Sequence, residues 1–197
     1  MSDNTATKTG NNVVNGVNTE VLGNLAQKLQ EKSDMGRVTF LSKTTWQEGT
    51  RVLSQVGENK LDGRLIYNGK RQFVEQSDQP PEFSGNDTAP GPLELLLHAI
   101  GSCITTTTNI NAAFMGVTLN KLEVNLESDI DLHGLFALDK NVRPGINELR
   151  ARIEIAGDAD ADTLREVVNR GFTYSPVRDS VNNGITITPE IVLSHKA

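Results

Sequence analysis

The sequence of 197 residues contains a single cysteine, Cys103, and only three histidines. One cysteine excludes an internal disulfide and any zinc site built from several thiolates. The histidines are far apart and form neither an HxxxH nor an HExxH pattern (His98, His133 and His195). No glycine pattern matches GxGxxG or GxxxxGK, the loops that hold phosphate groups. We therefore expect neither a metal ion nor another cofactor.

Basic residues are also scarce. Nineteen Lys and Arg stand against 25 Asp and Glu, which gives a net charge of −6, and the isoelectric point is near 5.1. Because binding to phosphates requires clustered Lys and Arg, this balance excludes a nucleic-acid partner. The Asn- and Thr-rich start of the chain lacks the apolar segment of a signal peptide. These features predict a cytoplasmic protein.

No apolar run is long enough, without interruption, to cross a membrane. The longest candidate is Leu93–Met115, and it is interrupted by Glu94, His98, Thr105 to Thr108, Asn109 and Asn111. Each of these would be costly in lipid. The segment therefore predicts a buried helix, and we expect no membrane partner.

The chain divides into three parts. Residues 1–17 are rich in Asn, Thr and Gly, have little to bury, and predict a disordered tail. Residues 18–34 predict an amphipathic helix, because apolar side chains recur at helical spacing (Val21, Leu22, Leu25, Ala26 and Leu29). Residues 35–197 form the main domain.

The main domain begins with strands and turns and then alternates helices with strands. Predicted strands are Arg37–Trp46, Arg51–Val56, Gly63–Tyr67 and Arg71–Glu75, with a hairpin turn at Asn68-Gly69. Residues 77–91 form a loop long enough to be functional. Further predicted helices are Pro92–Met115 (closed by Gly116), Ala161–Arg170 and a turn at Pro176–Val181, and further strands cover 122–132, 149–155 and 185–193. This order predicts an α+β fold.

Cys103 is the remaining candidate nucleophile. A lone cysteine among apolar residues can also be a small core residue. Cys103 lies about eleven residues into its helix, beyond the reach of the helix dipole, so a thiolate there needs a cation from elsewhere in the fold. Glu94 is predicted to cap the helix at Gly91, and it is half a turn out of phase with Cys103.

Several motifs, in order, resemble the OsmC/Ohr family. They are the segment from Gly91 to Cys103, with its following threonines and Gly116-Val117, then residues 128–134, 142–145 and 174–179. The resemblance covers about residues 36–194 and makes 35–197 an OsmC-like domain. It implies an intertwined homodimer in which a β-sheet from both chains wraps around long central helices.

The resemblance also implies a reaction. Characterised members reduce organic hydroperoxides under oxidative stress, using a thiolate at the position of Cys103 and a second cysteine that closes a disulfide. An Arg and a Glu stabilise the thiolate and orient the substrate. The corresponding residues here are Arg51 and Glu94, although Leu93 occupies the position of the family's glutamate and Glu94 follows one residue later.

The second cysteine position is Ser175, which predicts an ordinary helix N-cap before Pro176. A hydroxyl cannot close a disulfide, so the two-cysteine cycle cannot run within this chain. Two hypotheses follow. The first is a thiol-dependent peroxidase in which an external thiol reductant resolves the oxidised Cys103. The second is a non-catalytic homodimer that binds a small apolar ligand on the same scaffold.

Overall fold

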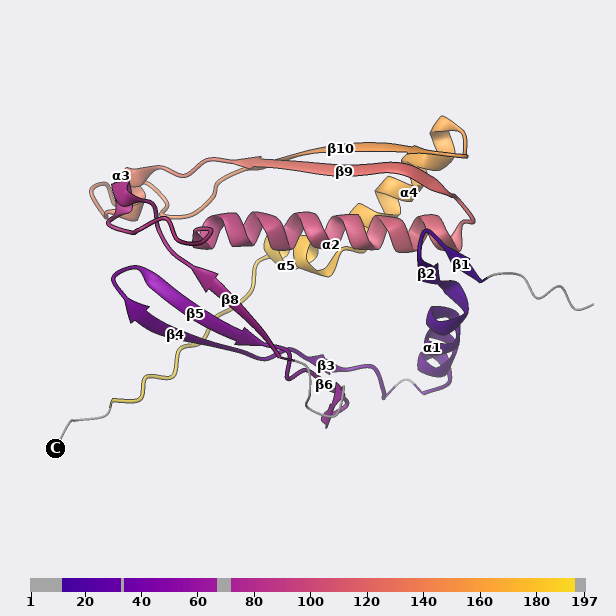
Figure 1. Ribbon diagram of the computed structural model, residues 1–197, viewed down its shortest axis with the longest axis horizontal. Coiled ribbons are helices and arrows are strands. Elements are labelled where there is room, and N and C mark those ends of the chain that lie inside the picture. The colour runs from indigo at the N-terminus through magenta and orange to yellow at the C-terminus, as the bar shows by residue number, and fades with distance from the viewer. Residues whose placement is uncertain (1–11, 33, 67–71, 194–197) are drawn as a thin grey trace, which may run out of the picture.

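A computed structural model of the chain describes residues 12–32, 34–66 and 72–193 (Figure 1). A long central helix, α2 (Pro92–Phe114), runs between two layers. On one side lies a hairpin of two long strands, β9 (Leu119–Ser128) and β10 (Leu149–Gly157), and on the other a three-stranded sheet. Helices α4 (Ala161–Thr173) and α5 (Pro176–Asn183) pack against α2. The predicted α+β class is confirmed.

Helix α2 begins and ends where the sequence predicts. Pro92 is its first residue, and the Gly91 backbone N–H donates to the Glu94 carboxylate at 2.6 Å. This bond satisfies a donor that the first turn would otherwise leave unpaired, and it confirms Glu94 as the capping residue. After the last turn, Gly116 adopts a φ of +71°, a conformation that glycine accepts without strain.

The long hairpin forms because its apolar residues alternate. Val124 pairs with Ile153 and Leu122 with Ile155, and these side chains are half-buried, whereas Glu123 between them is exposed. Packing of this apolar face against α2 removes it from water. The strand predicted over 149–155 is confirmed. The strand predicted over 122–132 ends at Ser128, because Leu132 begins the short helix α3 (Leu132–Leu135) with Asp131 as its N-cap.

The core lies at the C-terminal end of α2. Ala112, Val117 and Val167 are buried together, and the partly buried side chains around them are Leu119, Ile155, Ala159 and Leu164. Helix α4, which is longer than predicted, crosses α2 at Gly171. A Cβ atom at Gly171 would lie only 2.1 Å from Thr108 Oγ1, so the absence of a side chain permits the crossing.

The first strands differ in part from the prediction. The expected strand Arg37–Trp46 is divided into β3 (Val38–Thr39) and β4 (Ser42–Glu48), while β5 (Arg51–Val56) is as predicted. The sheet order is β4-β5-β8, and β3 joins β6 and β7 in a smaller sheet (β6 Lys60–Leu61, β7 Arg64–Leu65, β8 Phe73–Ser77). Asp62 and Gly63, with φ of 48° and 78°, form the turn between β6 and β7. The predicted Asn68-Gly69 turn lies outside the described residues.

The N-terminal part contains order that the sequence interpretation missed. Val13–Val14 (β1) and Val17–Asn18 (β2) form a short hairpin within the segment predicted to be disordered, of which residues 1–11 lie outside the described part. The Asn15 side chain donates to the Val117 carbonyl and accepts from the Leu119 N–H, both at 2.9 Å. The hairpin is ordered because it binds the turn after α2. Helix α1 (Thr19–Glu31) follows as predicted, with Asn18 as N-cap and no buried residue.

The predicted last strand, 185–193, does not form. The segment leaves α5 and continues without hydrogen-bonded neighbours among the described residues, and Ile187 is 85% exposed. A strand requires a partner edge, and within the described part of one chain this segment lies beside none. The apolar residues of 185–193 do alternate as in a strand, but the described part of the chain provides no neighbouring strand with which this segment can pair.

The crossing at Gly171 yields a stability prediction. Gly171→Ala would force a methyl group into Thr108 and should lower the free energy of unfolding by about 2–3 kcal/mol in urea titrations. Gly23→Ala is the matched control, since nothing lies within 4 Å of its Cβ position in α1, and it should raise stability by about 0.5–1 kcal/mol. Equal effects of the two substitutions would contradict the proposed contact.

Candidate functional site

Cys103 lies in the middle of α2 on a face that is only partly covered. Residues at spacings of three and four share this face and are partly exposed; we call them the Cys103 stripe (Leu96, Ala99, Cys103, Thr107 and Ile110). By contrast, Ile100, Ile104 and Thr108 on the neighbouring face are buried. Cys103 as a residue is therefore partly exposed in the single chain. The backbone carbonyl of Cys103 accepts a hydrogen bond from the Thr107 hydroxyl.

No described side chain forms a hydrogen bond with the Cys103 sulfur. Glu94 lies nine residues earlier on α2, where its carboxylate is held at Gly91. Arg51 begins β5 opposite Glu48 and lines a small hollow of the three-stranded sheet. Within the described part of one chain, the hydrogen bonds and ion pairs do not join either residue to Cys103. The role of Arg51 and Glu94 beside Cys103 therefore stays a prediction.

Ser175 occupies the N-cap position of α5, and Pro176 is the first residue of the helix, as predicted. Its hydroxyl does not make the predicted capping bond. The side chain is fully buried, and Oγ has no hydrogen-bond partner. An unpaired buried hydroxyl is unfavourable, so this position is better suited to a less polar atom of similar size, such as a thiol sulfur.

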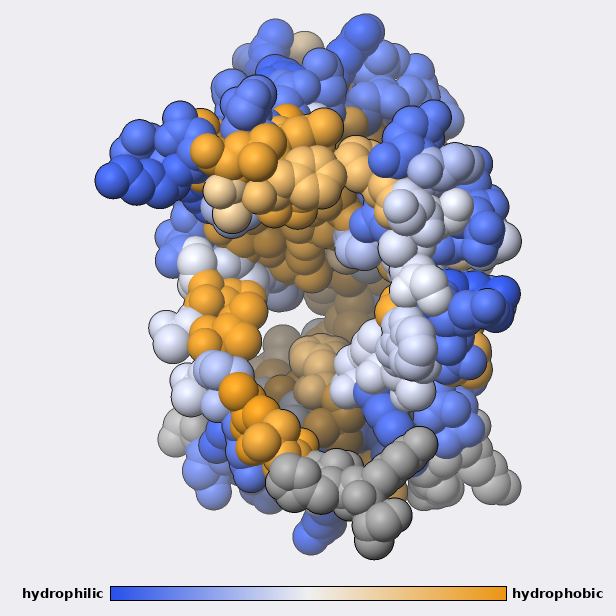
Figure 2. All heavy atoms as spheres, turned by 90° about the vertical axis from the view of Figure 1, so that its left-hand side faces the viewer, coloured by the Kyte–Doolittle hydropathy of each residue, from blue (hydrophilic) through white to orange (hydrophobic). Residues whose placement is uncertain are grey.

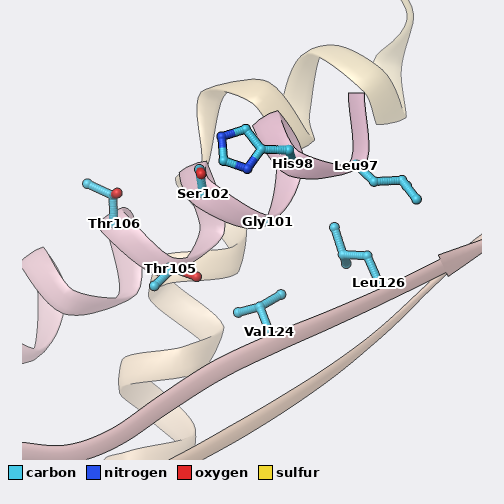
Figure 3. Close-up of a pocket in the computed structure, with 8 residues that line it drawn as sticks. All are labelled: Leu97, His98, Gly101, Ser102, Thr105, Thr106, Val124 and Leu126. Atoms are coloured by element: carbon cyan, nitrogen blue, oxygen red, sulfur yellow. The ribbon is translucent and has the colours of Figure 1, made fainter. Parts of the chain in front are cut away.

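A groove runs between α2 and β9 on a second face of the helix (Figure 3). Gly101, Ser102 and Thr105 line it from α2, and Val124 and Leu126 line it from β9. Its volume is about 490 Å³. His98 and Ser102 lie one turn apart at its edge, and Cys103 is not among its lining residues. The groove therefore belongs to a different face from the thiol.

A larger cavity lies at the N-terminal end of α2, and we call it the end cavity. Its volume is about 800 Å³. Three segments enclose it: the loop that contains the short 3-10 helix η2 (Pro81–Phe83), the first turn of α2, and the region of α3 (Leu132–Leu135). Figure 2 faces this end of the molecule and shows hydrophobic residues gathered around a hollow. Glu94 lines the end cavity, and Cys103 does not.

Asp78 anchors the loop that forms one wall of the end cavity. Its carboxylate is only 1% exposed and accepts hydrogen bonds from the hydroxyls of Thr50 (2.7 Å) and Thr88 (2.8 Å). The backbone N–H groups of Gln79, Asn86 and Thr88 also donate to it. Because the Thr50 and Thr88 hydroxyls and these amides stabilise the charged form, the pKa of Asp78 lies far below its ordinary value.

The described residues contain no cluster of three or more His, Cys, Asp or Glu side chains that is arranged to hold a metal ion. None of the described helices is both long and apolar enough to span a bilayer.

Residues 85–190 match the family model described as OsmC-like protein. This segment contains the central helix with Cys103 near its midpoint, the β9–β10 hairpin and the helices α4 and α5. This match covers more than half of the chain. The chain belongs to the OsmC-like family. The matched region contains Cys103, Glu94 and Ser175, whereas Arg51 and the first two sheets precede it.

Solved structures share this fold at low sequence identity. An OsmC-like protein from Mycoplasma pneumoniae is 16% identical, with a TM-score of 0.54, over 73% of this chain and 87% of that one. A putative osmotic stress induced and detoxification response protein from Psychrobacter arcticus is 19% identical, with a TM-score of 0.51, over 71% and 85% of the two chains. No curated protein sequence matches the chain.

The sequence interpretation did not identify Asp78 or the end cavity of this OsmC-like protein. A signal was present, because residues 72–120 contain no Lys or Arg but five acidic residues (Glu75, Asp78, Glu82, Asp87 and Glu94). The sequence does not show which of these carboxylates is buried and which lines the cavity. The fold of loop 77–91 against Thr50 decides this. That contact joins segments 28 residues apart.

The anchoring carboxylate should govern the acid stability of the loop. Asp78→Asn replaces a charged acceptor of five hydrogen bonds and should lower the melting temperature at pH 7 by about 5 °C or more. Since the pKa of Asp78 is lowered on folding, its contribution is complete above the ordinary carboxyl pKa of about 4 and is lost as the pH falls further. The difference between wild type and variant, measured by thermal scans, should therefore shrink below pH 4. A difference that stays constant to pH 2 would contradict this assignment.

Proposed function

We propose that this OsmC-like protein reduces organic hydroperoxides with Cys103 as its peroxidatic residue. The observation that carries the proposal is the position of Cys103: it lies at the middle of the central helix of the family domain, with its side chain partly exposed on an apolar stripe. An apolar peroxide can reach the sulfur there. The family supports a role in peroxide-related stress, and the single-cysteine mechanism is our own proposal.

The reaction requires one thiolate and an external thiol. The Cys103 thiolate attacks an oxygen of the hydroperoxide, the O–O bond breaks, and the alcohol leaves after taking up a proton. Cys103 becomes a sulfenic acid. An external thiol then condenses with it, releasing water and forming a mixed disulfide, and a second external thiol releases Cys103 in its reduced form.

A second copy of the chain completes the site in this proposal. Large apolar side chains that would otherwise face water support a homodimer: Phe40 is 76%, Trp46 69% and Phe114 52% exposed. Phe114 extends the Cys103 stripe by one more turn, so the stripe is a surface on which the α2 of a second copy can pack. The unpaired segment 185–193 can add to an exposed strand edge of that copy. The cation that favours the thiolate, for which Arg51 is our candidate, then comes from the partner.

The alternative is a homodimer that binds an apolar ligand without reaction. The size of the end cavity and its separation from Cys103 favour this alternative. Alkylation rates separate the two functions. A Cys103 that reacts with iodoacetamide at pH 6–7 is a stabilised thiolate, whereas one that reacts only near pH 9 is an ordinary thiol.

Cys103→Ser should abolish consumption of cumene hydroperoxide in the presence of a dithiol, a fall of at least 100-fold. In the wild-type protein, dimedone should label Cys103 after one equivalent of peroxide, as detected by mass spectrometry. Undiminished consumption by Cys103→Ser, or a wild-type Cys103 that stays unlabelled, would refute the peroxidase proposal.

Ser175→Cys should introduce a resolving thiol. Gly171 of α4 lies against Thr108 of α2, and α5, which begins after Ser175, also packs on α2 (Figure 1). We infer from this packing that Ser175 lies near the part of α2 that carries Cys103. We expect peroxide to oxidise the variant to an intrachain disulfide, with the loss of both free thiols. Ser180→Cys, on the same helix, is the matched control and should form none. Two free thiols in peroxide-treated Ser175→Cys would contradict this placement.

Phe114→Glu should convert the homodimer to a monomer in light-scattering measurements, because it places a charge at the apolar contact between the two α2 helices. Leu138→Glu serves as the control. It changes a residue that is 72% exposed in the loop before β10, at the other end of α2, and should leave the dimer intact. A wild-type monomer, or a dimeric Phe114→Glu, would overturn this interface.

A further inference from the structure

The end cavity combines apolar walls with carboxylates. Phe83, Leu93 and Phe136 form part of its wall, and Glu82, Asp87 and Glu94 also line it. No Lys, Arg or His is among its lining residues. A cavity of about 800 Å³ with mostly apolar walls and a few polar groups has the size and composition of a small-molecule site.

The carboxylates of the end cavity are not neutralised by neighbouring side chains. Within the described residues, Glu82, Asp87 and Glu94 take part in no ion pair with Lys, Arg or His. The buried, ionised Asp78 behind the wall adds a fourth negative charge. The N-terminus of α2 opposes them with a partial charge of only about +0.5, and the Glu94 carboxylate already binds it. The lining of the cavity therefore carries a net negative charge.

We propose that the end cavity binds a small amphipathic organic cation, an alkyl- or arylammonium. Its apolar part would occupy the space between Leu93, Phe83 and Phe136, and its ammonium group would face Glu82 and Asp87 at the exposed rim. The rings of Phe83 and Phe136 add to this preference, because the face of an aromatic ring attracts a cation. An anionic amphiphile such as a fatty acid would meet several like charges and should be rejected.

This binding goes beyond the proposed peroxide chemistry and does not depend on it. Cys103 does not line the end cavity, and Glu94, which does, is engaged in capping α2. The ligand is recognised by charge and shape alone. Cys103→Ser should therefore retain the binding, so that failure of the peroxidase proposal and failure of this one can be told apart.

The test compares three ligands that share one chain length. Octyltrimethylammonium, octanol and octanoate are titrated into the full-length Cys103→Ser protein in a calorimeter at low ionic strength. We expect the ammonium to bind about tenfold more tightly than the alcohol and the carboxylate to bind most weakly. Salt at 0.5 M should reduce the preference for the ammonium, because the rim is exposed and its charges are screened.

Variants then locate the site. Glu82→Gln combined with Asp87→Asn keeps side-chain size and should remove the preference for the ammonium over octanol; Asn tolerates the φ of +53° at position 87. Glu75→Gln removes an exposed carboxylate of β8 that does not line the cavity and should change nothing. Phe83→Ala should weaken both the ammonium and the alcohol.

Three results would overturn the inference. The first is octanoate that binds as tightly as the ammonium. The second is a double variant that unfolds at the wild-type temperature and still prefers the ammonium over octanol. The third is that none of the three ligands binds. The last result is expected if a second copy of the chain fills the end cavity.

Discussion

The crossing of α4 over α2 is the contact on which the other parts of the fold depend. It places Gly171 directly against Thr108, at a distance that leaves no room for a side chain. The adjoining core of Ala112, Val117 and Val167 holds the C-terminal half of α2 between α4 and the β9–β10 hairpin. Because that half is held, the thiol of Cys103 and the N-terminal half of the helix have fixed positions. The connection from α4 to α5 then returns along α2 and carries Ser175 with it.

In one half of the molecule the apolar side chains are thus covered by other parts of the same chain, and in the other half many of them stay exposed. Toward β9, β10 and α4 the apolar side chains are covered. Toward the β4-β5-β8 sheet, the Cys103 stripe and the segment 185–193 remain uncovered in the described part of the chain. Among the described residues, no hydrogen bond or ion pair links Arg51 or Glu94 to Cys103, since Glu94 caps α2 at Gly91 and Arg51 begins β5.

Local signals identified most elements because their information lies within a few residues. Pro92, Glu94 and Gly116 define the ends of α2 through capping chemistry, and the alternation around Val124 and Ile153 defines the hairpin. The interpretation was wrong, or made no prediction, where the deciding contact is distant. Asn15 is ordered by Val117 and Leu119, about a hundred residues later, and Asp78 is anchored by Thr50 across a chain reversal. Ser175 has the sequence of an N-cap, yet burial keeps its hydroxyl from the capping bond.

The amino-acid sequence by itself determined the α+β class, the family and the uniqueness of Cys103, because these follow from residue identity, short motifs and short-range periodicity. Only the tertiary structure decided that the Cys103 stripe is left partly exposed, that 185–193 lacks a partner, and that the acidic residues after β8 divide between an anchor and a cavity wall. Each of these depends on which surfaces meet when distant segments pack. No local pattern of side chains encodes that information.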